Sequence, residues 1–238
     1  MLTYFSNPAR FRALARWLVP LSAISAALLL IPGLYYALFD SPPDYQQKES
    51  VRIMYIHVPA AWVSLMAYAS MGAAAIAHLV WKHVLGGLYI RAVAPVGATF
   101  TAICLVSGSL WGLPTWGTWW VWDARLTSVL ILFFLYAGII LLDRAYDDQD
   151  RGLTASSWLA AIGLINLPII KYSVTWWNTL HQPASLTSFS KIANPAIAPE
   201  MLHPLLLMAG AFTAIFTALA LIRLRTAIAE RKERIHER

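Results

Sequence analysis

Charged residues divide this sequence into six long apolar runs, and these runs constrain the fold more than any other feature. Only 13% of the 238 residues are Asp, Glu, Lys or Arg, about half the share in an ordinary soluble domain. Each run has roughly 17 or more uncharged residues, which is enough for a helix to cross the hydrocarbon core. The runs predict membrane helices at about 17–39, 53–81, 92–110, 126–142, 153–171 and 201–222.

The expected fold is therefore an all-α integral membrane protein, with residues 1–238 forming one polytopic domain. A β-barrel is not expected, because the chain has no repeated ten-residue alternation of apolar and polar residues. A cleavable signal peptide is not expected either, since Pro8 and three arginines precede a first apolar run that is too long.

The basic residues predict the orientation of the six helices. Thirteen of the 18 would lie on the side of the two termini: Arg10, Arg12, Arg16, Lys82, Arg91, Arg144, Arg151, Arg223, Arg225, Arg231, Lys232, Arg234 and Arg238. The other side would keep Lys48, Arg52, Arg125, Lys171 and Lys191. By the positive-inside rule, both termini are cytoplasmic. The segments at about 40–54, 111–125 and 172–199 then face outward.

Missing motifs exclude several classes of function. The chain has no C-x-x-C-H sequence, so it is not a cytochrome with covalently attached haem. It has no phosphate-binding loop of the Walker type, so any use of ATP requires a partner. Charged residues are absent from the middle of the runs, which argues against an ion-coupled pump.

An unusual group of aromatic residues lies in the second outward segment, WGLPTWGTWWVWDAR at 111–125, which holds five of the 11 tryptophans. Exposed indoles at this density favour a flat apolar ligand that covers them. An aromatic belt at the membrane interface is the alternative. We expect Pro114 to end the preceding helix, and Trp119 and Trp122 to share one face of a short amphipathic helix. Gly117 would allow a planar ligand to approach closely.

Two histidines would lie at the level of these tryptophans. The predicted topology places His57 and His181 on the outward side, in different segments. Two imidazoles are suited to the two axial positions of a haem iron. Each could instead be an interfacial histidine that binds water or backbone. His203 is a rival ligand beside Pro204, and His78 is the only histidine well inside an apolar run.

A haem ligand would also need partners for its anionic propionates. Arg125 is the first candidate, followed by Arg52 and Lys191, with Lys48 as a further possibility. Asp123 would repel a propionate. It is expected either to cap the next helix or to hold Arg125 and indole N–H groups in place.

The stretch WGTWWVWDARLTS resembles the tryptophan-rich WWD signature of the haem-handling proteins of cytochrome c biogenesis. Within that family, six helices and one WWD segment between two outward histidines resemble the haem exporter protein C (CcmC) group. A second similar stretch is WWNTLHQP at 176–183. Larger members resemble haem lyases and have more helices.

This resemblance implies a site and a role. His57 and His181 would be axial ligands of the haem iron. The WWD surface would comprise Trp116, Gly117, Trp119, Trp120, Trp122 and Asp123. The haem would be b-type, bound non-covalently and transiently at the periplasmic face of the bacterial inner membrane.

The resemblance also implies partners. These are a periplasmic haem chaperone (CcmE-like), two subunits of an ATP-binding-cassette transporter (CcmA- and CcmB-like) and a small single-helix protein (CcmD-like). The chain would then be a haem-transfer component rather than a conventional enzyme. Two alternatives remain open: a bis-histidine electron-transfer protein, and a structural subunit of a transporter.

Overall fold

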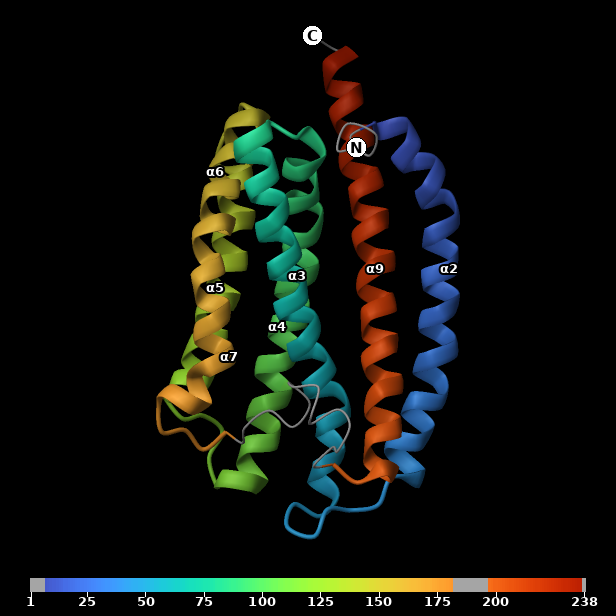
Figure 1. The fold of residues 1–238 in the computed structure, drawn as a ribbon, viewed down its shortest axis with the longest axis vertical. Coiled ribbons are helices and arrows are strands. Elements are labelled where there is room, and N and C mark those ends of the chain that lie inside the picture. The colour runs from blue at the N-terminus through green and yellow to red at the C-terminus, as the bar shows by residue number, and fades with distance from the viewer. Residues whose placement is uncertain (1–6, 182–196, 237–238) are drawn as a thin grey trace.

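The computed structural model describes residues 7–181 and 197–236, which form an elongated helical bundle (Figure 1). The elements in chain order are α2 (Pro8–Tyr35), the π-helical turn η1 (Tyr36–Asp40), the 3-10 turn η2 (Glu49–Ile53), α3 (Met54–Trp81), α4 (Val84–Trp116), α5 (Ala124–Arg144), α6 (Gln149–Ile162), the 3-10 turn η3 (Gly163–Ile165), α7 (Asn166–Trp176) and α9 (Pro199–His236).

Within the described residues, six helical segments are long and apolar enough to cross a membrane. The α6, η3 and α7 elements together form one of these segments. The predicted all-α fold with six membrane helices is therefore confirmed. The start of α2 and the end of α9 both lie at the top of Figure 1, and we call this the terminal end of the bundle. The opposite end, with the connections at 41–48, 117–123 and 177–181, is called the distal end.

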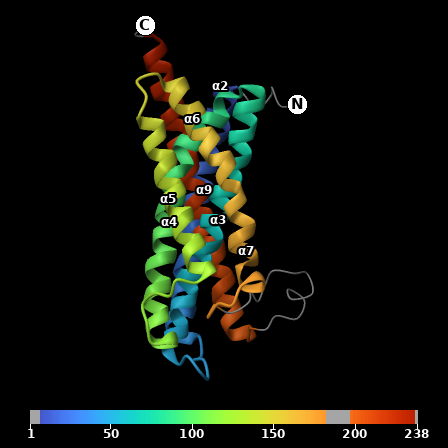
Figure 2. The same cartoon turned by 90° about the vertical axis from the view of Figure 1, so that its left-hand side faces the viewer.

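Two helix pairs have the most extensive contacts: α2 with α9, and α3 with α4. Helix α9 also packs on α3 and α4, which joins the two pairs. Helix α5 packs on α4, α6 and α7, and α3 and α4 lie between α5 and α9 (Figure 1). Figure 2 views the bundle from the side of α5, α6 and α7. Tyr136 of α5 is fully buried inside the bundle. Its hydroxyl donates a hydrogen bond of 2.8 Å to the carbonyl of Ser64 in α3. This bond satisfies a polar group that would otherwise be costly inside a membrane.

The membrane span formed by α6, η3 and α7 is interrupted shortly before Pro168. Because Pro168 has no N–H, the regular hydrogen bond to the carbonyl of Leu164 cannot form, and residues Gly163–Ile165 take up the tighter 3-10 conformation. The side chain of Asn166 donates a 2.9 Å hydrogen bond to the carbonyl of Ser128 in α5. This bond connects the interrupted span to its neighbour.

Several helices extend beyond the predicted bounds. The third begins at Val84 rather than near 92, and the last runs from Pro199 to His236 rather than ending near 222. Charged residues mark where the apolar core of a membrane ends, but a helix can continue into water past that point. The expected bounds therefore described membrane spans rather than helices.

Two local predictions were wrong. Pro114 lies inside α4, which continues to Trp116 and ends at Gly117, where φ is +74° and the N–H bonds the carbonyl of Leu113 at 3.0 Å. Gly117 favours this left-handed cap because it has no Cβ. Residues 117–123 are also not helical, so Trp119 and Trp122 do not share a helix face.

Replacing Gly97 tests the packing around Tyr136. A Cβ at Gly97 would overlap the Tyr136 ring and hydroxyl, so Gly97→Ala is expected to lower the free energy of unfolding by about 1–3 kcal/mol. Gly138→Ala is a matched control, since its Cβ would meet only the flexible end of Leu159 at 3.0 Å. Thermal unfolding in detergent, followed by tryptophan fluorescence, measures both. Equal midpoints would contradict tight packing at Gly97.

Candidate functional site

The two histidines singled out in the sequence lie next to each other at the distal end. The ring centroids of His57, in the first turn of α3, and His181, just after α7, are 6.4 Å apart, and the ring planes are inclined by 33°. Both side chains are partly buried. Two residues separated by 124 positions in the chain thus form one imidazole pair.

The His57 ring is held by α4. Its Nδ1 lies 3.0 Å from the carbonyl oxygen of Cys104 and 3.2 Å from the hydroxyl of Ser107. A carbonyl only accepts hydrogen bonds, so this contact requires the proton on Nδ1 and leaves the lone pair on Nε2. A ring nitrogen fixed by such a bond is the usual arrangement in metal-binding histidines.

A glycine makes this contact with α4 possible. The nearest atom to a Cβ added at Gly108 would be Cε1 of His57, at 2.8 Å. The imidazole therefore packs directly against the backbone of α4. Any larger side chain at this position would displace the His57 ring from its place.

The His181 backbone is held by Asp123, the last residue of the WWD core. One oxygen of Asp123 accepts the N–H of Leu126 at 2.8 Å and caps α5. The other oxygen accepts the hydroxyl proton of Thr179. The Thr179 oxygen accepts the N–H of His181 at 3.0 Å. Of the two roles expected for Asp123, the structure has the helix cap, and it adds this connection to His181.

The tryptophans surround the pair unequally. Trp116, in the last turn of α4, has its ring centroid 6.1 Å from that of His181. Trp120 and Trp122 pack edge to face at 5.6 Å. Trp119 and Trp122 are 53% and 76% exposed, whereas the Nε1 of Trp120 is buried with no hydrogen-bond partner among the described residues. The WWD segment thus contacts His181 through Trp116 and presents exposed indole surface at Trp119 and Trp122.

Three contributors to the site, Ser107, Gly108 and Thr179, were not predicted from the sequence. Trp111 belongs to the predicted aromatic segment at 111–125, but its contact with His57 was not expected. Trp111 packs edge to face on His57 at 5.7 Å and donates a 2.8 Å hydrogen bond to the side chain of Gln47. The pair Ser107-Gly108 inside an apolar run was a usable signal, because small residues mark close helix contacts in membranes. The role of Thr179 had no comparable signal.

The candidate propionate partners differ in how they are already engaged. Arg125 donates from Nε to the hydroxyl of Ser173 at 2.8 Å. Arg52 donates from Nε to Glu49 at 2.6 Å and from Nη1 to the carbonyl of Ala37 at 2.8 Å. Lys48 donates to the carbonyl of Tyr45 at 2.9 Å. Lys191 lies outside the described residues.

The two rival histidines have other contacts. His203 packs edge to face on Tyr36 at 4.9 Å, at the junction of α9 with η1. His78 lies near the terminal end of α3, with Nδ1 3.1 Å from the carbonyl of His83. A buried bis-histidine pair around His78 is therefore not present among the described residues.

The arrangement fits a metal bound between two imidazoles. A metal–imidazole bond is about 2 Å long, so two ligands of one metal have ring centroids roughly 6 Å apart. The observed separation is 6.4 Å. Among the described residues no group of three or more His, Cys, Asp or Glu could hold a metal ion. Two imidazoles can fill the two axial positions of a metal whose equatorial ligands belong to a bound porphyrin.

Comparison with known proteins decides the family. The family model described as heme exporter protein C matches residues 1–238. The chain belongs to the heme exporter protein C family. The resemblance inferred from the WWD segment is therefore confirmed.

Individual relatives match about three quarters or more of this chain. The protein of that name from Bradyrhizobium diazoefficiens is 48% identical over 229 residues, covering 96% of this chain and 86% of the relative. The one from Escherichia coli K12 is 47% identical over 221 residues, covering 93% of this chain and 88% of the relative. A putative cytochrome c biosynthesis ccmC-like mitochondrial protein of Marchantia polymorpha is 47% identical over 180 residues, covering 76% of this chain and 75% of the relative.

Removing the Thr179 hydroxyl tests how the His181 segment is held. In Thr179→Val, the His181 N–H loses its acceptor, so its amide is expected to exchange with deuterium at least several-fold faster. Thr175→Val is the matched control, because this exposed hydroxyl bonds only the carbonyl of Tyr172, one turn earlier. Hydrogen–deuterium exchange of the peptide containing 177–181 measures the effect. Identical exchange in all three proteins would contradict the proposed connection.

Proposed function

We propose that this protein binds haem at the distal end of its bundle and delivers it to a haem chaperone for the maturation of c-type cytochromes. The observation that carries the proposal is the 6.4 Å separation of the His57 and His181 rings beside the WWD segment. Membership of the heme exporter protein C family supports the same role.

In this proposal each part of the site has a distinct task. His57 and His181 ligate the iron through ring nitrogens, and the bond from Nδ1 of His57 to Cys104 keeps its Nε2 available. Trp119 and Trp122 cover the apolar porphyrin, together with Trp116, Gly117 and Trp120. The haem would be b-type, held non-covalently and only transiently.

The propionates would be bound by Arg125. Only its Nε is engaged in a side-chain hydrogen bond with the described residues, whereas Arg52 already contacts both Glu49 and the carbonyl of Ala37. A guanidinium can bind a carboxylate through two parallel hydrogen bonds. Arg52 and Lys191 are the secondary candidates.

The proposed location is the bacterial inner membrane, with the distal end facing the periplasm. The excess of Lys and Arg at the terminal end supports this orientation. Delivery to a periplasmic chaperone (CcmE-like) then requires no movement of the haem across the bilayer after binding. Partner subunits (CcmA- and CcmB-like) would supply ATP hydrolysis, and a single-helix protein (CcmD-like) would complete the assembly.

Two alternatives are weaker. An electron-transfer cytochrome would hold its haem deep between helices, but the imidazole pair lies at the end of the bundle beside exposed indoles. A purely structural subunit would not need a histidine ring packed on Gly108 and fixed by Cys104. That alternative predicts that substituting either histidine leaves the protein's function unchanged.

Replacing the histidines tests the ligand assignment. The protein purified with haem is expected to show a six-coordinate bis-histidine absorption spectrum, which His57→Ala and His181→Ala each abolish along with chaperone loading. His203→Ala and His78→Ala are the controls and should leave the spectrum unchanged. An unchanged spectrum in both His57→Ala and His181→Ala would overturn the assignment. Loss of the spectrum only in His203→Ala would make that residue the ligand.

Replacing two exposed indoles tests the aromatic surface. Trp119→Ala combined with Trp122→Ala should weaken haem retention or chaperone docking by about tenfold or more, since stacking on each indole contributes roughly 1 kcal/mol. Membrane insertion should not change. Trp81→Ala combined with Trp158→Ala is the control, because these indoles are also exposed but lie in α3 and α6, outside both the WWD segment and the WWNTLHQP stretch. Unchanged haem content and unchanged chaperone loading would favour the interpretation of the segment as an aromatic belt at the membrane interface.

A further inference from the structure

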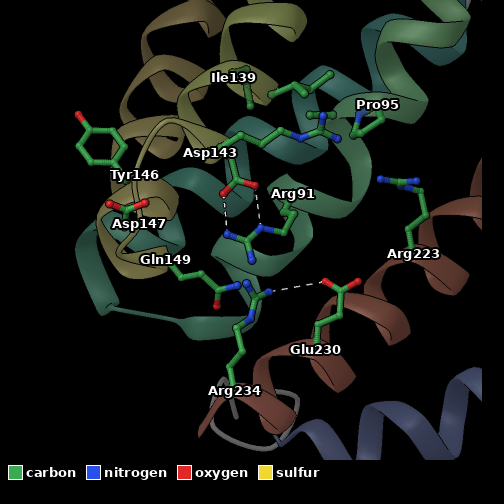
Figure 3. Close-up of a pocket in the computed structure, with 13 residues that line it drawn as sticks. Arg91, Pro95, Ile139, Asp143, Tyr146, Asp147, Gln149, Arg223, Glu230 and Arg234 are labelled. Atoms are coloured by element: carbon green, nitrogen blue, oxygen red, sulfur yellow. Dashed lines mark hydrogen bonds and ion pairs between the residues drawn. The ribbon is translucent and has the colours of Figure 1, made fainter. Parts of the chain in front are cut away.

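A second candidate site lies at the terminal end, on the far side of the bundle from the histidine pair. A cavity of about 400 Å³ lies between α4, α5 and α9 (Figure 3). Its lining is apolar on one side, with Ala94 and Pro95 of α4 and Ile139 and Ile140 of α5. Its remaining lining is dominated by charged groups, including four arginines.

Two of the arginines are neutralised within the protein. Arg91 forms a double hydrogen bond with the carboxylate of Asp143, at 2.7 and 2.8 Å. Arg234 lies 3.8 Å from Glu230, one turn away on α9. These two pairs contribute no net charge to the cavity.

The other two arginines, Arg144 and Arg223, are exposed and have no ion-pair partner among the described residues. Nε of Arg223 donates a 2.9 Å hydrogen bond to the carbonyl of Ala92 in α4, which fixes the guanidinium against the cavity. Figure 3 shows Arg223 facing the cavity from α9, across from Pro95. Asp147, an exposed residue at the rim, is the one lining carboxylate without an ion pair in the described part. The unpaired lining groups therefore carry a net charge of about +1.

The position of the cavity relates it to the membrane. Helices α5 and α9 both pack on α4, and the cavity lies between them. Arg144 is the last residue of α5, and Ile139 and Ile140 lie about one turn deeper in the same span. Guanidinium groups at the level of the headgroups and apolar residues at the level of the acyl chains match an amphiphile whose anionic group is at one end.

We propose that this cavity binds one anionic glycerophospholipid from the leaflet at the terminal end. Arg144 and Arg223 would hold its phosphodiester, and Pro95, Ile139 and Ile140 would contact the first part of its acyl chains. A lipid with one net negative charge matches the surplus positive charge of the cavity. Zwitterionic lipids also have a phosphodiester, but their cationic headgroup leaves the two arginines incompletely neutralised.

Lipid retention by the purified full-length protein tests this site. The protein is delipidated in detergent, incubated with equal amounts of phosphatidylglycerol, phosphatidylethanolamine and phosphatidylcholine, and analysed by native mass spectrometry. Phosphatidylglycerol should be retained preferentially. Arg144→Gln and Arg223→Gln should each weaken its retention about fivefold, and both together roughly 25-fold. Arg151→Gln with Arg225→Gln is the matched control, since both residues are exposed, lie at the same end and do not line the cavity.

Further arms separate the possible outcomes. Excess glycerol 3-phosphate should compete poorly, because it lacks acyl chains; competition as effective as that of the lipid would show a simple phosphate site and overturn the proposal. Equal retention of the three lipids, or equal losses in the control pair, would also overturn it. Arg144→Gln is expected to fold normally, because Arg144 makes no side-chain hydrogen bond or ion pair in the described part of the chain. Its retention defect should therefore occur with an unchanged unfolding midpoint.

Discussion

The contact of the His57 ring with the backbone of α4 is the interaction on which the distal site depends. The ring is fixed by the carbonyl of Cys104 and by the absence of a side chain at Gly108. Both features exist only because α3 and α4 pack closely along their length. The position of this imidazole is therefore set by the membrane-embedded core rather than by the loop that precedes α3. An imidazole held in this way keeps its geometry when the surrounding connections move.

His181 is positioned by different means. It lies beyond the end of α7, outside any helix, and its backbone is held through Thr179 by the carboxylate of Asp123. The same carboxylate caps α5, so one side chain fixes both the start of a membrane helix and the segment of the second histidine. Asp123 therefore links the WWD segment to His181 even though it cannot itself bind an anionic group. Under the proposed function, this explains why an acidic residue can end an otherwise aromatic segment at a site for a dicarboxylate ligand.

The sequence predicted the spans well because the cost of burying charge in lipid leaves an unambiguous pattern. It also predicted that His57 and His181 lie at one end, since the number of spans determines the side of every connection. It did not predict the ends of α4 or α9, because helices continue past the apolar core. The helix expected at Trp119 and Trp122 does not form, since Gly117 ends α4 and Asp123 starts α5, leaving too few residues between them. The partners of Gly108 and Thr179 lie in distant segments. The small pair Ser107-Gly108 indicates a close helix contact but does not identify His57 as the partner, and Thr179 has no local signal.

The unequal attachment of the two histidines fits transfer better than storage. Under the proposed function, a carrier must hold haem long enough to meet a partner and then release it without unfolding. Displacing His57 would require α3 and α4 to separate. His181 lies outside any helix, so displacing it breaks local contacts, such as the hydrogen bond to Thr179 and the ring contact with Trp116, without separating two helices. Because a net protein hydrogen bond contributes about 1 kcal/mol, the second change is far less costly than opening a helix interface. The exposed faces of Trp119 and Trp122 lie on the same end of the bundle, so an incoming partner can approach the porphyrin there while His57 still holds the iron. Release would then begin at His181, and the rigid helical part of the site would be ready for the next haem.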